Sequence, residues 1–241
     1  MSTKTVAFIG ASFGVGLSAL KHTLAAGHKC IALCRTPSRL TDVISPSENP
    51  NLQVIQGNAH DLAAVSRCLT KEDGTIVDEI VSTIGGKPIL HKLTNDDPHV
   101  CGKGMATLLE ALAQLRRSGA PGGPPIVVCS STGMSRFGRD VPVLMMPLYG
   151  YLLEVQKADK RVMEDGLVDS GEDFTIVRAS LLVNGETDAP VRVGLEDPKI
   201  GREVDVIGYT ISREDAGKWV AENLVLKREE KYVNKIAVVT Y

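Results

Sequence analysis

Short apolar runs rich in β-branched residues alternate along this chain with longer amphipathic segments. The short runs predict buried strands, and the longer segments repeat their apolar residues at helical spacing. Strands are expected over 5–10, 29–34, 52–57, 75–86, 125–131, 174–180 and 235–240, and helices over 15–26, 61–69, about 99–117, 149–169 and 213–226. Regular alternation of this kind predicts an α/β fold, a Rossmann-type doubly wound, mainly parallel sheet with helices on both faces.

The segment between 184 and 211 departs from this alternation. Residues 184–205 are polar and rich in Gly and Pro, which indicates loop and edge structure, whereas 203–211 predicts a further strand. Asp61 and Ser212 precede two of the predicted helices, where their side chains would cap the first turn. We expect residues 1–241 to form a single domain.

Composition narrows the class of protein. Lys and Arg (27) nearly balance Asp and Glu (29), which argues against nucleic-acid or membrane-surface binding. The five cysteines form no CxxC pair, as expected for free thiols in a reducing compartment. No apolar run approaches the ~18 residues of a membrane span, and the N-terminal residues lack the apolar core of a signal peptide. A cytoplasmic protein that binds a small-molecule substrate is expected, and its oligomeric state is not indicated by the sequence.

Three glycines in the spacing GxxxGxG follow the first predicted strand and lead into the first predicted helix. Glycine is needed where the backbone approaches a pyrophosphate, and amide groups at the start of the helix then face the anion. Glycines are also ordinary turn residues, but here strand, loop, helix and second strand fall within about 30 residues. The loop therefore predicts dinucleotide binding by Gly10, Ser12, Phe13, Gly14, Val15 and Gly16.

The second predicted strand ends at Cys34, where an acidic residue would bind the adenosine ribose of NAD. Arg35 follows instead, and no acidic residue occurs between positions 1 and 41. A guanidinium stacks on adenine and pairs with a 2′-phosphate, so Arg35 favours NADP(H). Ser12 is a second candidate phosphate contact, and Arg39 lies one helical turn later. The alternative for both arginines is a solvated surface position.

Several motifs occur in a fixed order along nearly the whole chain: FIGASFGVG (8–16), CRTPSRL (34–40), QGNAHD (56–61), VSTIGG (81–86), VVCSSTG (127–133), DSGEDFTIVRASLLVNG (169–185) and ISREDAGKWV (211–220). With this series the chain resembles the atypical short-chain dehydrogenase/reductases, specifically the NmrA-like and flavin-reductase-like NAD(P)-binding proteins. The ordered series is more specific than any one of its motifs.

The resemblance implies positions for the cofactor. It places the pyrophosphate at the glycine loop, the 2′-phosphate at Arg35, and the adenine near Asn58 and Asp61. It places the ribose and nicotinamide over Thr83, Ile84 and Gly85, with Ser130, Ser131 and Thr132 facing the nicotinamide. It also implies that Lys157 reaches toward the nicotinamide ribose, and that ISREDAGKWV is a structural helix start.

Two features depart from that family pattern. Most NmrA-like members space the loop as GxxGxxG, whereas this loop has the spacing of the tyrosine-dependent short-chain dehydrogenases. The proline expected after Arg178 is replaced by Ala179, which frees the backbone before the substrate loop.

The tyrosine–lysine pair of the tyrosine-dependent enzymes is absent. In that pair a lysine four residues after the tyrosine lowers its pKa for proton transfer. Leu153, Val155 and Arg213 stand four residues after Tyr149, Tyr151 and Tyr209. The absence of this pair weakens the interpretation of the chain as a tyrosine-dependent ketone reductase. Reduction is still possible, because hydride transfer needs only the cofactor and the right geometry, with a proton available from solvent.

The nearest substitutes for a catalytic apparatus are Ser131, Tyr149, Tyr151 and Lys157. Ser131 would polarise a substrate oxygen, and either tyrosine would enter the cleft at the start of its helix. The alternatives are a strand-end turn for Ser131, packing for the tyrosines and a solvated helix face for Lys157. No metal site is expected, because the histidines, including His91 and His99, lack zinc-ligand spacing.

Two segments are expected to line the substrate. Residues 134–153 place methionines beside aromatic residues, which indicates an adaptable apolar pocket for a flat or hydrophobic molecule. The alternative is that Met145 and Met146 begin a core helix. Residues 184–205 form the second, polar segment.

These features together predict an NADPH-dependent oxidoreductase that transfers hydride to a small hydrophobic or aromatic acceptor, such as a carbonyl, an activated alkene, a flavin or a quinone-like molecule. Two alternatives remain open: a regulator that senses NADP(H) without catalysis, and a non-redox isomerase or cyclase. Fold alone does not separate them.

Overall fold

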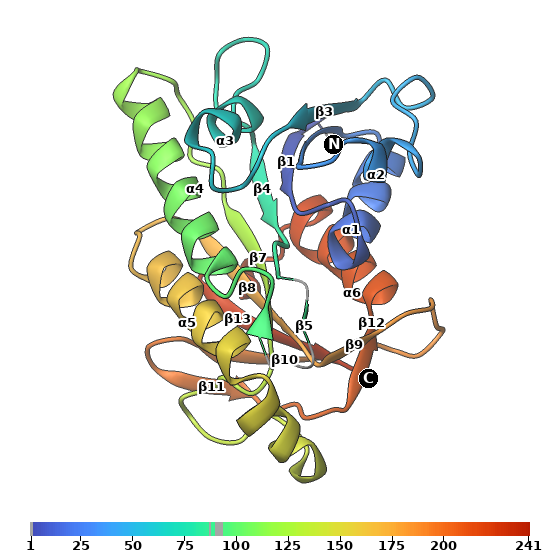
Figure 1. Ribbon diagram of the computed structural model, residues 1–241, viewed down its shortest axis with the longest axis vertical. Coiled ribbons are helices and arrows are strands. Elements are labelled where there is room, and N and C mark those ends of the chain that lie inside the picture. The colour runs from blue at the N-terminus through green and yellow to red at the C-terminus, as the bar shows by residue number, and fades with distance from the viewer. Residues whose placement is uncertain (1, 87, 90–93) are drawn as a thin grey trace.

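The computed structural model describes residues 2–86, 88–89 and 94–241, and it is organised around one nine-stranded sheet (Figure 1). Seven strands are parallel, in the order β3-β2-β1-β4-β7-β8-β13. They are β1 (Thr5–Ile9), β2 (Lys29–Cys34), β3 (Leu52–Gln56), β4 (Glu79–Ser82), β7 (Ile126–Ser131), β8 (Phe174–Ala179) and β13 (Lys235–Thr240). The predicted α/β fold with a mainly parallel sheet is confirmed.

An antiparallel hairpin extends this sheet beyond β13. It consists of β10 (Arg192–Asp197) and β11 (Gly201–Val204). Two small pairs lie apart from the central sheet: β9 (Leu181–Val183) with β12 (Thr210–Ser212), and β5 (Pro88–Ile89) with β6 (Thr94–Asn95).

Helices cover both faces of the sheet (Figure 1). On one face lie α1 (Gly14–Ala25), α2 (Ser38–Thr41) and α6 (Arg213–Val220), and on the other lie α3 (Leu62–Cys68), α4 (Val100–Arg117) and α5 (Glu154–Val168). Successive strand residues point to opposite faces, so β1 sends Val6 and Phe8 into one core and Ala7 and Ile9 into the other. No helix among the described residues has the length and apolar character needed to cross a membrane.

Both predicted caps are confirmed. The Asp61 carboxylate accepts from the backbone N–H groups of Ala63 (3.0 Å) and Ala64 (3.2 Å) at the start of α3. The Ser212 hydroxyl accepts from the N–H of Asp215 (2.9 Å) at the start of α6. All five cysteines are free thiols, as predicted.

Three element predictions need correction. The helix predicted over 213–226 is α-helical only as far as Val220, the end of α6, and continues as a π-helical segment, Ala221–Leu226. The strand predicted over 203–211 is wrong, because these residues are divided between β11 and β12 and belong to different sheets. Between them Gly208 passes so close to Thr240 that a side chain would collide with its hydroxyl. The helix predicted over 149–169 is interrupted: a π-helical turn, Leu148–Leu152, precedes α5. His91 lies outside the described residues.

Candidate cofactor site

The carboxyl ends of the parallel strands bring the predicted cofactor residues to one edge of the sheet. The loop after β1 lies where the strand order reverses, with β2 and β3 on one side and β4, β7 and β8 on the other. In doubly wound sheets a ligand binds in the crevice at this switch point.

Close backbone contacts shape the glycine loop. Gly10 has φ +95°, and a methyl group there would lie 2.9 Å from the Ile84 nitrogen. At Gly16 a methyl group would collide with Thr83 Oγ1, which donates a hydrogen bond to the Gly10 carbonyl (3.0 Å). Glycine is therefore required at both positions for packing against the end of β4.

The start of α1 has no side-chain cap from the part of the chain that the structure describes. Phe13 stands at the N-cap position and makes no side-chain cap, and the first turn holds no acidic residue. Ser12 is half-buried beside it, Val15 is buried and Phe13 is 68% exposed. An uncapped helix N-terminus behind a glycine loop is a binding site for phosphate, which fits the pyrophosphate of a dinucleotide.

The residues predicted around the adenosine end lie at the surface. Arg35 directly follows β2 and is exposed, and Arg39 is exposed on α2. Asn58 is exposed after β3, and its side-chain oxygen accepts from the His60 N–H (3.3 Å). The structure thus places both arginines and Asn58 at the same edge as the glycine loop, while the Asp61 carboxylate is occupied as a helix cap.

The segment after β4 continues this edge. Gly85 is exposed, with no neighbour where a side chain would be. Ile84 packs its Cδ1 against Gly104 of α4, and its carbonyl lies 3.5 Å from the Cys101 thiol. Burial raises the pKa of Cys101 to about 12, so this thiol stays protonated near neutral pH.

Ser130 and Ser131 at the end of β7 lie on opposite faces of the sheet. Val127 and Cys129 pack on the side of α1 and α6, and by strand alternation Ser131 belongs to that side. Ser130 belongs to the side of α4 and α5, is 1% exposed, and its hydroxyl has no partner among the described residues.

Thr132, rather than Ser131, meets Tyr149. The hydroxyls of Thr132 and Tyr149 are hydrogen-bonded, and both residues are buried. Burial raises the pKa of Tyr149, and the Thr132 hydrogen bond opposes that shift. The sequence carries a signal for this placement. Side chains alternate along a strand, so counting by twos from Ile126 puts Thr132 on the same face as α5.

Lys157 is only 7% exposed, so the solvated-face interpretation is wrong for this residue. Its ammonium donates to the Tyr149 carbonyl (2.9 Å) within the π-helical turn. Tyr151 points away from this cluster at 76% exposure. The structure therefore joins Tyr149 and Lys157 through a backbone carbonyl and leaves Ser131 and Tyr151 apart from them.

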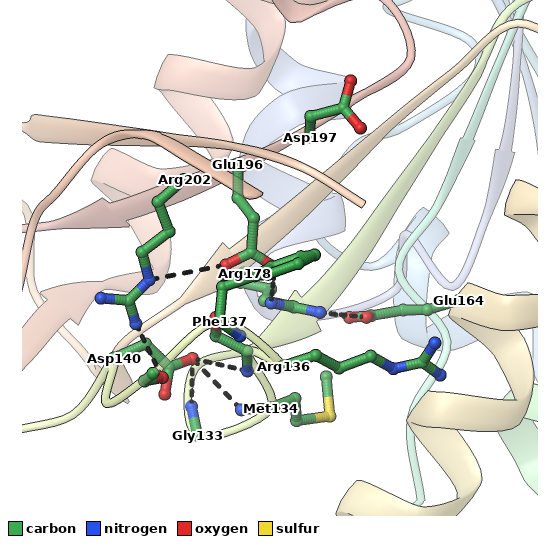
Figure 2. A network of polar contacts seen from close by, with 12 residues as sticks. Gly133, Met134, Arg136, Phe137, Asp140, Glu164, Arg178, Glu196, Asp197 and Arg202 are labelled. Carbon is green, nitrogen blue, oxygen red and sulfur yellow. Dashed lines mark hydrogen bonds and ion pairs between the residues drawn. The ribbon is translucent and has the colours of Figure 1, made fainter. Parts of the chain in front are cut away.

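A buried charge network holds the loop after β7 (Figure 2). The Asp140 carboxylate accepts from the consecutive N–H groups of Gly133 (2.9 Å), Met134 (3.1 Å) and Ser135 (3.2 Å). The Ser135 hydroxyl then donates to Glu196 (2.5 Å) of β10. This network fixes the first part of the predicted segment 134–153.

Arg178 occupies the centre of that network (Figure 2). It lies between Glu164 of α5 (2.6 Å) and Glu196 (2.9 Å), and all three side chains are at most 5% exposed. The opposed carboxylates tie α5, β8 and β10 together beneath the substrate-side loop.

Part of the segment 134–153 presents apolar side chains outward, whereas Tyr149 is buried. Val143, Leu144 and Met146 are 66%, 79% and 49% exposed, so the alternative of a core helix beginning here is wrong. In the second predicted segment, 192–204 forms the β10–β11 hairpin, which confirms the edge structure and leaves 184–191 as the loop.

Residues at the start of α6 bind the beginning of the second predicted segment, 184–205. Arg213, Glu214 and Asp215 bind successive parts of it: the Asn184 side chain (2.8 Å), the Gly185 N–H (3.1 Å) and the Thr187 N–H (3.1 Å), respectively. Among the described residues no cluster of three or more His, Cys, Asp or Glu side chains is arranged to hold a metal ion.

The model of the NAD(P)H-binding family matches residues 10–225, which include the glycine loop, all of the strand ends above and the start of α6. The chain belongs to this NAD(P)H-binding family. The predicted NAD(P)-binding character is thereby confirmed, and a nicotinamide dinucleotide is the family's ligand.

Two relatives match over the full chain. Reductase pytE of Aspergillus terreus is 40% identical over 266 residues, covering 100% of this chain and 99% of the relative. Oxidase pynE of Aspergillus niger is 30% identical over 279 residues, with the same coverage. Among solved structures, a short-chain dehydrogenase/reductase of Veillonella parvula in complex with NADP has a TM-score of 0.75 at 16% identity, covering 100% of this chain and 95% of its own. That likeness concerns the fold.

Proposed function

We propose that the protein is an NADPH-dependent oxidoreductase that transfers hydride to a small hydrophobic or aromatic acceptor. The observation that carries the cofactor choice is Arg35, which is exposed directly after β2 where NAD enzymes place an acid. The names of the two full-length relatives, a reductase and an oxidase, support redox chemistry.

The residues at the carboxyl edge fit such a cofactor. The glycine loop and the N–H groups at the start of α1 would hold the pyrophosphate, and Arg35 with Arg39 the 2′-phosphate. Asn58 would lie near the adenine, and 83–85 beneath the ribose and nicotinamide. NADPH supplies the hydride when it is bound, and the exposed apolar residues of 143–146 would receive the acceptor.

Proton supply in this proposal comes from solvent. The Tyr149 phenol is 4% exposed and bonded to Thr132, and the Lys157 ammonium is bonded to a carbonyl. Both residues are buried, Lys157 at 7% exposure, so an acceptor at the open edge would not meet either group directly. A reduced acceptor at the open edge of the sheet would instead take its proton from water.

Cofactor choice is tested by titrating NADPH and NADH into the wild type and Arg35→Asp, with nicotinamide fluorescence as the readout. Loss of a charge-assisted phosphate contact predicts about 10- to 100-fold weaker NADPH binding, with NADH within a few-fold of the wild type. Arg67→Asp, an equal charge change on an exposed α3 residue, is the matched control. Equal weakening of both cofactors would exclude Arg35 as the 2′-phosphate contact.

The reaction class is tested by following NADPH absorbance with quinones, flavins, aldehydes and activated alkenes. We expect NADPH consumption with at least one apolar acceptor. Tight NADPH binding without turnover of any acceptor would favour the regulatory alternative. Product formation without net NADPH change would favour the isomerase or cyclase.

A further inference from the structure

The exposed N-terminus of α1 concentrates positive charge beside the glycine loop. Its first turn has neither a side-chain cap nor an acidic residue, whereas α3 and α6 are capped by Asp61 and Ser212. The partial positive charge of the helix therefore faces the loop without compensation. A further cation at this place is unfavourable unless an anion joins it.

Arg213 is that further cation. It is the first residue of α6, and its side chain packs on the loop: a methyl group added at Gly14 would lie 3.1 Å from the Arg213 Cδ. The guanidinium lies over the ring of Phe13, 5.8 Å from the ring centroid. The charge is thus carried directly to the residues that open α1.

Helix packing fixes Arg213 in this place. α1 and α6 lie side by side on the same face of the sheet (Figure 1). Gly217 approaches α1 so closely that a methyl group there would collide with the Val15 carbonyl. The Ser18 hydroxyl of α1 also donates to the Glu214 carbonyl (2.6 Å). The position of Arg213 over the loop is therefore a consequence of the fold.

Among the described residues the Arg213 guanidinium has one hydrogen-bond partner, and that partner is neutral. Its Nη1 donates to the Asn184 side-chain oxygen (2.8 Å), and it forms no ion pair with any residue in the described ranges. One of five N–H donors is thereby used. Arg178, by contrast, is neutralised by two carboxylates.

We propose that Arg213 binds the pyrophosphate of the nicotinamide dinucleotide beside the N-terminus of α1. The planar guanidinium, held over Phe13, would present paired N–H groups to phosphate oxygens. This inference rests on the proposed cofactor and deepens it. Because the pyrophosphate is common to NADH and NADPH, Arg213 supports binding of both, whereas Arg35 separates them.

The test compares ligands that contain or lack a pyrophosphate. Arg213→Gln and Arg213→Lys are titrated with NADPH, NADH and ADP-ribose by fluorescence or displacement, and with 2′-AMP, which has no pyrophosphate. For Arg213→Gln we expect about 10- to 100-fold weaker binding of the first three ligands and no more than a twofold change for 2′-AMP. Arg213→Lys retains the positive charge but lacks the paired N–H donors of the guanidinium. Its affinity for these ligands should therefore lie between that of Arg213→Gln and that of the wild type.

Lys218→Gln, which removes a positive charge from the last turn of the same helix, is the matched control and should bind all four ligands normally. Unchanged NADPH affinity in Arg213→Gln would overturn the assignment, as would equal weakening of 2′-AMP, which would indicate general damage to the edge. A wild type that binds neither NADPH nor NADH would instead overturn the cofactor on which the inference rests.

Discussion

Tyr149 has the chemistry of a proton donor but the surroundings of a packing residue. Its ring lies against Gly133, its phenol bonds to Thr132, and burial raises its pKa. A phenol that is 4% exposed cannot reach an acceptor at the open edge without rearrangement of the π-helical turn. The role of Tyr149 therefore follows from its buried position rather than from the acidity of its phenol.

The substitution Tyr149→Phe distinguishes a proton-donating Tyr149 from a Tyr149 that only packs. We expect kcat to fall less than about threefold, whereas loss of a general acid or base removes about 10²–10⁴-fold. Stability should decrease by about 1–3 kcal/mol, because the buried Thr132 hydroxyl loses its partner. The measurements are kcat at saturating NADPH and urea unfolding. Tyr151→Phe at an exposed position serves as the control, and a hundredfold lower kcat in a stable Tyr149→Phe protein would contradict the expectation.

At the scale of elements, the first half of the fold was predictable because its signals are local. The glycines, the apolar run before them and the Asp61 cap lie within a few residues of the structure they specify. The division of 203–211 between two sheets was not predictable, because it depends on Gly208 crossing Thr240 from a distant part of the chain.

The same limit applies within the candidate site. The sequence predicts the strand after Pro125. Because successive residues of this strand point to opposite faces of the sheet, Ser131 points away from α5, whereas Thr132 lies on the α5 side and contacts Tyr149. Arg213 was predicted only as part of a structural helix start, because its approach to the loop depends on packing of α6 against α1. Tertiary contacts, rather than residue type, decide these roles.

The contact between α5, β8 and β10 depends on Arg178. Arg178→Met would leave the buried Glu164 without a counter-charge and Glu196 with only the longer contact to Arg202 (3.8 Å), which predicts a loss of about 3–5 kcal/mol of unfolding free energy. Arg136→Met breaks an exposed pair with Asp165 (2.7 Å) and should change stability by about 0–1 kcal/mol. Urea unfolding of both variants measures the difference. Similar losses for the two would show that burial does not strengthen the Arg178 network.

For the whole molecule, the edge opposite the cofactor site carries a buried acid that makes stability depend on pH. Glu79 begins β4, is 1% exposed, and accepts a hydrogen bond from Lys4 (3.2 Å). Burial raises the pKa of Glu79 to about 7, although the Lys4 charge opposes the shift. The folded protein therefore prefers the protonated carboxyl, while the unfolded chain ionises it near its ordinary value of 4.5.

This difference fixes the sign of the pH dependence. Below the unfolded value both states are protonated and Glu79 imposes no penalty. As pH rises from about 4.5 to about 7 the unfolded state releases its proton first, so the folded protein loses on the order of 3 kcal/mol of stability. Glu79→Gln cannot ionise, and its stability relative to the wild type should rise by this amount between pH 4.5 and pH 8.

Urea unfolding of both proteins at half-unit pH intervals measures that relative change. Subtracting the two unfolding free energies at each pH removes the contributions of all other titrating groups, which the two proteins share. Asp73→Asn is the control, because hydrogen bonds from Thr75 lower the pKa of Asp73 and keep it ionised across the window. Its stability curve should run parallel to that of the wild type. The expected pH-dependent loss of stability arises from removing the Glu79 carboxylate charge from water. If the stability of Glu79→Gln also ran parallel to that of the wild type, the Lys4 ammonium would have to compensate this burial completely.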